Sequence, residues 1–208
     1  MNNDGSGSEK ATHIRSFALR GGRFSKAQQS AYERLGPEFI VDTKGREPYS
    51  FSSIFRNENP VIVEIGFGSG SATAEIAENR RDINYLGIEV FKPGIGNLLK
   101  LIEEKNLTNI RIAEGDAYEI LRDKIGKSVL RGVHVFFPDP WPKKRHHKRR
   151  LIRPDFTAIL VQSLAQGGYR LSRTQGPRLG TGFSQQVRRI CSPPFLAAGN
   201  AVPPERGR

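Results

Sequence analysis

The chain has 208 residues, a length typical of one domain with a tail, and the 37% of residues that are apolar suffice for one core. No segment approaches the roughly 18 consecutive apolar residues of a membrane span, and the polar first residues predict a disordered lead-in rather than a signal peptide. Cys191 is the single cysteine, so an internal disulfide is excluded and a cytoplasmic location is expected.

The positive charge is confined to two segments. Residues 143–153 hold seven Lys or Arg and no acid, and residues 171–208 hold six Arg and one acid. These segments account for the whole net charge of +12, because the remaining residues are balanced. This distribution favours a polyanionic partner such as nucleic acid, with a solvated surface as the alternative.

Hydrophobic periodicity predicts alternating strands and helices. A short helix is expected from Ser25 toward Arg34, followed by a loop over residues 40–58. Strands are then predicted over 61–65, 85–88, 109–112 and 132–137, and helices over 71–79, 93–105, 117–124 and 154–166. This alternation predicts an α/β fold, with a doubly wound, mostly parallel sheet and helices on both faces.

The periodicity ends near residue 171. Gly, Pro, Ser and Arg dominate from there to Arg208, and breakers such as Gly-Pro and Pro-Pro recur. We therefore expect three parts: a disordered lead-in over 1–12, one domain over 13–168, and an atypical basic tail over 169–208. The sheet is expected to be incomplete at its C-terminal side.

A glycine-rich loop joins the first predicted strand to the next helix. It reads Glu64-Ile65-Gly66-Phe67-Gly68-Ser69-Gly70. Glycines allow a ligand to approach the backbone closely, and the following helix presents free N–H groups. Dinucleotide dehydrogenases have a similar loop, but the Gly-x-Gly-x-Gly spacing and the preceding acid favour S-adenosylmethionine. Glu64, Gly66 and Gly68 are therefore candidate cofactor contacts.

Two further acids follow the next two strands. Glu89 ends the second strand, where a carboxylate can accept hydrogen bonds from both ribose hydroxyls, and Asp116 follows the third, where it suits the adenine amino group. A solvated strand end is the alternative for either acid alone. Acids at the carboxyl ends of three consecutive strands favour a ligand site, because open α/β sheets bind ligands at that edge.

The fourth strand leads into a proline-rich loop, residues 137–142, that contains Asp139 and Trp141. Prolines fix φ and remove N–H donors, so we expect a stiff loop that holds Asp139 at the ligand edge. Trp141 offers a face for base stacking, with packing on the core as the alternative.

A basic run over residues 143–150 follows this loop directly and is expected to hold phosphates near the mouth of the site. A nuclear localisation signal has similar composition but more often lies on a tail. His146 and His147 would point apart in an extended loop and have no Cys or acid beside them, so no metal site is predicted.

Residues 137–150, Phe-Pro-Asp-Pro-Trp-Pro-Lys-Lys-Arg-His-His-Lys-Arg-Arg, resemble the signature of bacterial tRNA (guanine-N7) methyltransferases. The resemblance covers about residues 13–168. Several other segments also match the family: Arg15-Ser16-Phe17, Arg20, Gly22-Arg23, Gln28, Glu64-Ile65-Gly66-Phe67-Gly68, Gly87-Ile88-Glu89 and Gly115-Asp116-Ala117.

The resemblance implies a Rossmann-like class I methyltransferase that transfers a methyl group from S-adenosylmethionine to N7 of the guanine at position 46, in the variable loop of tRNA. It implies Asp139 as the catalytic residue and, with Glu64, Glu89 and Asp116, as a cofactor contact. Contacts to tRNA are implied for Lys143, Arg145, His146, His147, Lys148, Arg149 and Arg150. A monomer is expected.

After Gly168 the sequence departs from the family. Arg173-Thr174-Gln175-Gly176 stands where the family has Ala-Thr-Asp-Trp, and the family's closing Thr-x-Phe-Glu-x-Arg-Gly motif does not occur. We therefore expect a frameshift after Gly168 and weak or absent activity. Two alternatives stay open: a methyltransferase acting on another nucleic acid or a small molecule, and an inactive tRNA-binding remnant. A nicotinamide dehydrogenase would need a substrate domain that the sequence does not show.

Overall fold

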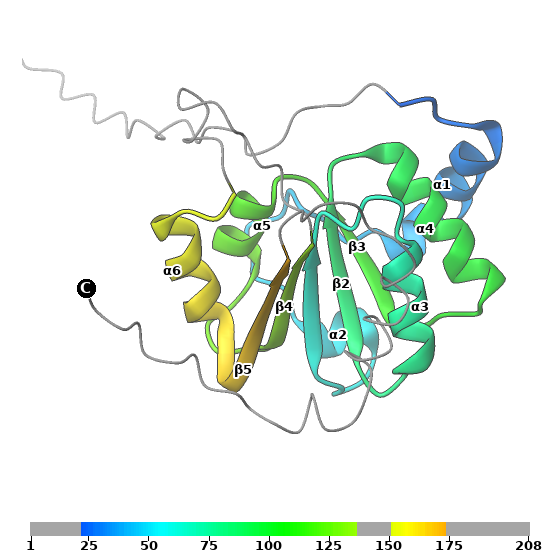
Figure 1. The fold of residues 1–208 in the computed structure, drawn as a ribbon. Helices are drawn as coiled ribbons and strands as arrows, with labels where there is room; N and C mark the ends of the chain where they lie inside the picture. The colour runs from blue at the N-terminus through cyan, green and yellow to red at the C-terminus, as the bar shows by residue number, and fades with distance from the viewer. Residues whose placement is uncertain (1–21, 137–150, 174–208) are drawn as a thin grey trace, which may run out of the picture.

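Five parallel strands form the central sheet of the part of the chain that a computed structural model describes, residues 22–136 and 151–173 (Figure 1). The strands lie in the order β3-β2-β1-β4-β5. Their bounds are β1 Val61–Ile65, β2 Asn84–Glu89, β3 Ile110–Glu114, β4 Leu130–Phe136 and β5 Leu164–Arg173. The chain therefore moves outward from β1 to β3 and then returns to place β4 on the other side of β1. Ligands of open α/β sheets bind beside such a switch in strand order.

Helices cover both faces of this sheet, and α1, α3 and α4 lie on one side while α5 and α6 lie on the other (Figure 1). Their bounds are α1 Lys26–Phe39, α2 Phe51–Phe55, α3 Ser71–Asn79, α4 Lys92–Glu104, α5 Ala117–Lys124 and α6 Pro154–Ser163. The predicted α/β class with a doubly wound parallel sheet is thus confirmed. Within the described ranges, no helix combines the length and the apolar character needed to cross a membrane.

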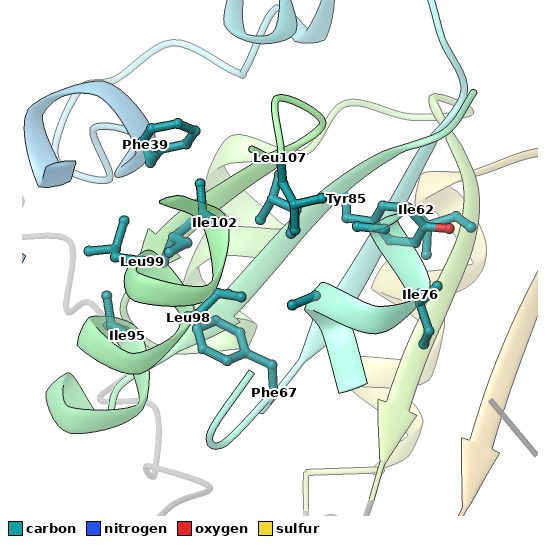
Figure 2. Close-up of a cluster of buried hydrophobic side chains, with 14 of the residues drawn as sticks. Phe39, Ile62, Phe67, Ile76, Tyr85, Ile95, Leu98, Leu99, Ile102 and Leu107 are labelled. Carbon is teal, nitrogen blue, oxygen red and sulfur yellow. The ribbon is translucent and has the colours of Figure 1, made fainter. Parts of the chain in front are cut away.

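Two cores fill the spaces between the sheet and its helices. The first core joins α1, α3 and α4 to the face of the sheet that carries Ile62 and Tyr85, and Figure 2 shows Leu98, Leu99 and Ile102 of α4 within it. The second core joins the other face to α2, α5 and α6. Every residue of β1 is buried, because this strand lies at the centre of the sheet with a core on each side.

The residue pattern explains where α1 begins. Ser25 caps α1 as predicted: its hydroxyl accepts from the backbone N–H of Gln28, and the Gln28 side chain accepts from the backbone N–H of Ser25. This reciprocal capping box satisfies two N–H groups that a helix start otherwise leaves free. The helix then continues beyond the predicted Arg34, to Phe39.

Two predictions about irregular segments are wrong. Residues 40–58 contain α2, a helix of 5 residues that is too short to show a period and that buries Phe55 in the second core. The helix predicted over 154–166 ends at Ser163, and Gly167-Gly168 lies inside β5 instead of ending a helix. Gly167 has a φ of +74°, and the pairing of β4 with β5 shifts between Leu130 and Gly132, so the glycines form an irregularity within the strand.

The fifth strand also extends regular structure beyond its expected limit. It runs to Arg173, so the predicted domain boundary at residue 168 falls inside β5. Tyr169 pairs with Gly132, and its ring occupies the space that a side chain at Gly132 would fill. The first residues of the predicted tail therefore belong to the sheet.

Candidate cofactor site

The glycine loop after β1 leaves space above its backbone. Gly66, Gly68 and Gly70 have φ values of +71°, +61° and +73°, a conformation that favours glycine. A Cβ atom built on Gly66 or Gly68 meets nothing within 4 Å. Gly70 is the N-cap of α3 and provides no side-chain cap, so the first N–H groups of that helix lack this partner. The loop can thus receive a ligand directly on its backbone.

Glu89, at the carboxyl end of β2, is tied to this loop. Its Oε2 accepts from the backbone N–H of Gly68 at 2.8 Å. Its Oε1 accepts from the backbone N–H groups of Val90 at 2.7 Å and Phe91 at 3.1 Å. These bonds fix the orientation of the carboxylate, and Oε2, which accepts one of the three, retains acceptor capacity for a ligand hydroxyl.

Helix α4 holds the other side of the glycine loop. A Cβ atom on Gly94 would lie 1.9 Å from the carbonyl oxygen of Gly68, so only glycine permits this approach. Asn97 adds a hydrogen bond from its side-chain amide to the carbonyl oxygen of Ser69, at 2.8 Å. No sequence motif indicates this contribution of α4, because it depends on a contact between two separate elements.

Asp116 has a structural role that the sequence did not predict. It is the N-cap of α5, and its Oδ1 accepts from the backbone N–H of Tyr118 at 2.8 Å. Asp116 is 9% exposed and lies just after β3, at the same sheet edge as Glu89. The cap fixes one of its oxygens toward the helix, and its contact with a cofactor stays a prediction.

Glu64 lies within β1, beneath the glycine loop, and is 2% exposed. Burial raises the pKa of its carboxyl to about 7, the nearby Thr73 hydroxyl opposes this rise, and the charge of Glu89 adds to it. Among the described residues, neither Oε2 of Glu64 nor the Thr73 hydroxyl has a hydrogen bond of good geometry. A buried carboxyl with an unsatisfied oxygen next to a ligand loop is the kind of group that a cationic ligand would ionise.

A cluster that sequence reasoning missed lies beside Glu89. Glu114 is the register partner of Glu89 on β3 and accepts a hydrogen bond from the Tyr32 hydroxyl of α1. Lys92 Nζ lies 3.7 Å from the Glu114 carboxylate and 5.6 Å from the centre of the Tyr32 ring. Burial, and then the bond to Glu114, raises the pKa of Tyr32 to about 12, so this hydroxyl keeps its proton. The cluster anchors α1 and the start of α4 at the ligand edge.

The residues that are predicted to act in catalysis and in tRNA binding lie outside the described ranges. β4 ends at Phe136, at the same edge of the sheet, three positions before Asp139. The predicted catalytic and tRNA-contacting residues all follow in the undescribed segment: Asp139, Lys143, Arg145, His146, His147, Lys148, Arg149 and Arg150. Within the described ranges, no group of three or more His, Cys, Asp or Glu residues could hold a metal ion.

A sequence model of a family described as "Putative methyltransferase" matches residues 58–198. The chain belongs to this methyltransferase family. The match covers the glycine loop, all five strands and the proline-rich loop. It also extends beyond Gly168, into the segment that was expected to depart from the family.

Curated relatives carry a more specific name. The tRNA (guanine-N(7)-)-methyltransferase of Paraburkholderia xenovorans (strain LB400) is 52% identical over 164 residues, which are 77% of this chain and 63% of the relative. That of Dechloromonas aromatica (strain RCB) is 47% identical over 163 residues, 78% of this chain and 66% of the relative. The resemblance to this family is confirmed, and the chain spans just under two thirds of these relatives' length.

Among solved structures, one described as an antibiotic-related methyltransferase superposes with a TM-score of 0.48 at 19% identity, over 68% of this chain and 70% of the other. This similarity is too low to add to the assignment. The family match and the parallel sheet with its glycine loop establish the Rossmann-like class I methyltransferase fold of the described residues.

Proposed function

We propose that the chain transfers a methyl group from S-adenosylmethionine to N7 of a guanine in tRNA. The main structural support for this proposal is the hydrogen bond between Glu89 and the open glycine loop, at the carboxyl edge of the sheet. The family match and the relatives named tRNA (guanine-N(7)-)-methyltransferase support the reaction. Cofactor binding, nucleic-acid binding and product formation can each be tested separately.

The residues at this edge fit the parts of S-adenosylmethionine. Glu89 would accept from the ribose hydroxyls, since its carboxylate is already oriented by three backbone N–H groups. The methionine end would lie over Gly66 and Gly68, with Glu64 beneath it as the counter-charge. Asp116 would lie near the adenine amino group, at the start of α5.

The chemistry requires positioning rather than acid–base catalysis. S-adenosylmethionine supplies an electrophilic methyl group on a sulfonium centre. Guanine N7 has an in-plane lone pair and carries no proton, so no base is needed to free it. Asp139 would accept hydrogen bonds from the guanine N1–H and amino group and offset the positive charge that develops on the base.

The basic segment would bind the tRNA backbone. Replacing four of its residues by Ala, Arg145, Lys148, Arg149 and Arg150, should reduce the slope of log affinity against log salt, by roughly 0.7–0.9 for each phosphate that is no longer neutralised. The matched control replaces four exposed cations elsewhere: Lys26, Lys44, Arg46 and Lys127. An equal decrease of slope in the control would mean that the segment has no special role.

The product identifies the reaction. Nucleoside mass spectrometry of an unmodified tRNA transcript, incubated with the chain and S-adenosylmethionine, should detect 7-methylguanosine. A transcript with adenine at position 46 and the Asp139→Ala variant are the controls, and neither should yield product. Another methylated nucleoside would show a different nucleic-acid specificity. Binding of both tRNA and cofactor without any turnover would favour the inactive remnant.

A further inference from the structure

His134 and Glu64 face the same side of the sheet on neighbouring strands. They are register partners on β4 and β1, so their Cα atoms are separated by the usual strand spacing of about 5 Å. The pair two residues earlier, Gly132 and Ile62, is in register as well, and Ile62 points into the first core. Because side chains alternate along a strand, His134 and Glu64 point to that same face. They are 1% and 2% exposed.

Each of these side chains has one unsatisfied polar atom. Nε2 of His134 forms a hydrogen bond with the Tyr169 hydroxyl of β5, at 3.1 Å. Among the residues described, His134 Nδ1 and Glu64 Oε2 have no hydrogen bond of good geometry, and the Thr73 hydroxyl lies near enough to Glu64 to act as a weak donor. Buried polar atoms are nearly always paired, so two unpaired atoms on adjacent register positions require an explanation.

We propose that His134 is a positioning residue for Glu64, with its Nδ1–H donating toward the carboxylate when that carboxyl is ionised. A small side-chain rotation or one bridging water closes the gap between register partners. The proposal requires the tautomer in which the Tyr169 hydroxyl donates to Nε2, so that the single imidazole proton lies on Nδ1. Hydrogen bonds through Tyr169, His134 and Glu64 thereby connect β5 to the candidate cofactor site. The inference rests on the proposed function, in which Glu64 is a cofactor contact.

Burial shifts the pKa of each of the two groups, and neither group is among the causes of the other's shift. Burial lowers the pKa of His134 to about 4, so the ring is neutral near pH 7 and has one N–H to offer. Burial raises the pKa of Glu64 to about 7, so a further hydrogen-bond donor would favour its ionised form. The other groups that influence Glu64 are Glu89 on β2, which disfavours ionisation, and the Thr73 hydroxyl on α3, which favours it.

Ring contacts hold the histidine in place. The Tyr169 ring lies 5.8 Å from the His134 ring, and the Phe136 ring lies 5.4 Å from it, between ring centres. On the other side of Glu64, the Phe67 ring packs over Gly87, the register partner of Glu64 on β2. The register neighbours of Glu64 on both sides, His134 and Gly87, are therefore each packed against aromatic rings.

The first test is the pH dependence of cofactor affinity, measured by calorimetry with S-adenosylmethionine. In the wild type, the dissociation constant should fall as pH rises toward about 7 and then level off, because the cationic cofactor favours ionised Glu64. His134→Leu should move this midpoint to higher pH and weaken binding at pH 7 by about three- to tenfold, the effect of removing one hydrogen bond. Tyr169→Phe should shift the midpoint in the same direction, by less.

Two controls separate positioning from packing. His134→Gln keeps an N–H donor and should recover most of the affinity. Tyr85→Phe removes another buried tyrosine hydroxyl from the same face of the sheet and should leave the midpoint unchanged. If cofactor binds and His134→Leu keeps the wild-type midpoint, the proposal is wrong and His134 is a packing residue.

A second measurement does not require the cofactor. In nuclear magnetic resonance spectra of the cofactor-free chain, the His134 ring signals should shift as Glu64 ionises near pH 7, and Glu64→Gln should abolish this step. If the His134 signals show this titration step but the chain does not bind the cofactor, the proposed function is contradicted and the pairing of His134 with Glu64 is supported. If the chain binds the cofactor but the His134 signals show no titration step, the proposed function is supported and the pairing of His134 with Glu64 is wrong.

Discussion

Glu89 accepts a hydrogen bond from the backbone N–H of Gly68 at 2.8 Å, which ties the end of β2 to the glycine loop after β1. The same carboxylate also accepts from the two N–H groups that lead into α4. One side chain therefore joins three segments at the carboxyl edge of the sheet, which is the candidate cofactor site. A ligand hydroxyl that binds to Glu89 binds to a group whose position the backbone has already fixed, so the entropic cost of ordering the side chain is small.

Asp116 is expected to have two separable roles. Asp116→Ala removes both the cap of α5 and the carboxylate, so it should lower the free energy of unfolding by about 1 kcal/mol and also weaken cofactor binding. Asp116→Ser keeps a cap and should restore the stability but not the affinity. Chemical denaturation and calorimetry measure the two effects. If Ser restores the affinity as well, Asp116 is a cap and not a cofactor contact.

Gly94 is expected to be required for the shape of the glycine loop. Gly94→Ala places a Cβ atom 1.9 Å from the Gly68 carbonyl oxygen, so it should destabilise the fold by about 1–3 kcal/mol and reduce cofactor affinity. Gly36→Ala in α1 is the matched control, because its Cβ would meet only Ile40, at 3.4 Å. That variant should gain up to about 1 kcal/mol from better helix propensity. Equal effects in both helices would contradict this role of α4.

The buried acid and base should have opposite effects on stability between pH 4 and pH 7. The folded state binds the extra proton at Glu64, whose pKa is raised from 4.5 to about 7, so this group lowers stability as pH rises. The unfolded state binds the extra proton at His134, whose pKa is lowered from 6.5 to about 4, so this group lowers stability as pH falls. In the wild type the two effects should largely cancel over this range.

Single substitutions should reveal how each of the two groups changes the free energy of unfolding with pH. Glu64→Gln leaves the histidine effect, so its stability should fall on acidification by up to about 3 kcal/mol relative to the pH 7 value, whereas His134→Leu should become more stable on acidification by a similar amount. Urea denaturation at several pH values measures both slopes, with Tyr85→Phe as a variant that should follow the wild type. Parallel curves for the two variants would show that these groups titrate normally.

Local sequence patterns predict the bounds of those helices and strands whose ends are determined by neighbouring residues. β1, α3 and α5 have the bounds that their periodicity indicated, because apolar runs, glycines and caps are local signals. The cluster of Tyr32 and Glu114 joins residues 82 positions apart, and no local pattern marks it. The Glu64 and His134 pairing needs the strand register, which the sequence leaves open. The sequence does not predict β5, because Gly167-Gly168 directly after an apolar helical segment is typical of a helix end.

The measurement that tests the central claim most directly is calorimetric binding of S-adenosylmethionine to the wild-type chain and to Glu89→Ala, with Glu58→Ala as a control at an exposed acid outside the site. The wild type and the control should bind with equal affinity. Glu89→Ala should bind about ten- to a hundredfold more weakly, as expected when ribose hydroxyls are deprived of a charged acceptor. A folded wild-type sample that does not bind the cofactor, or a Glu89→Ala variant that binds as well as the control, would contradict the assignment of this edge as the cofactor site.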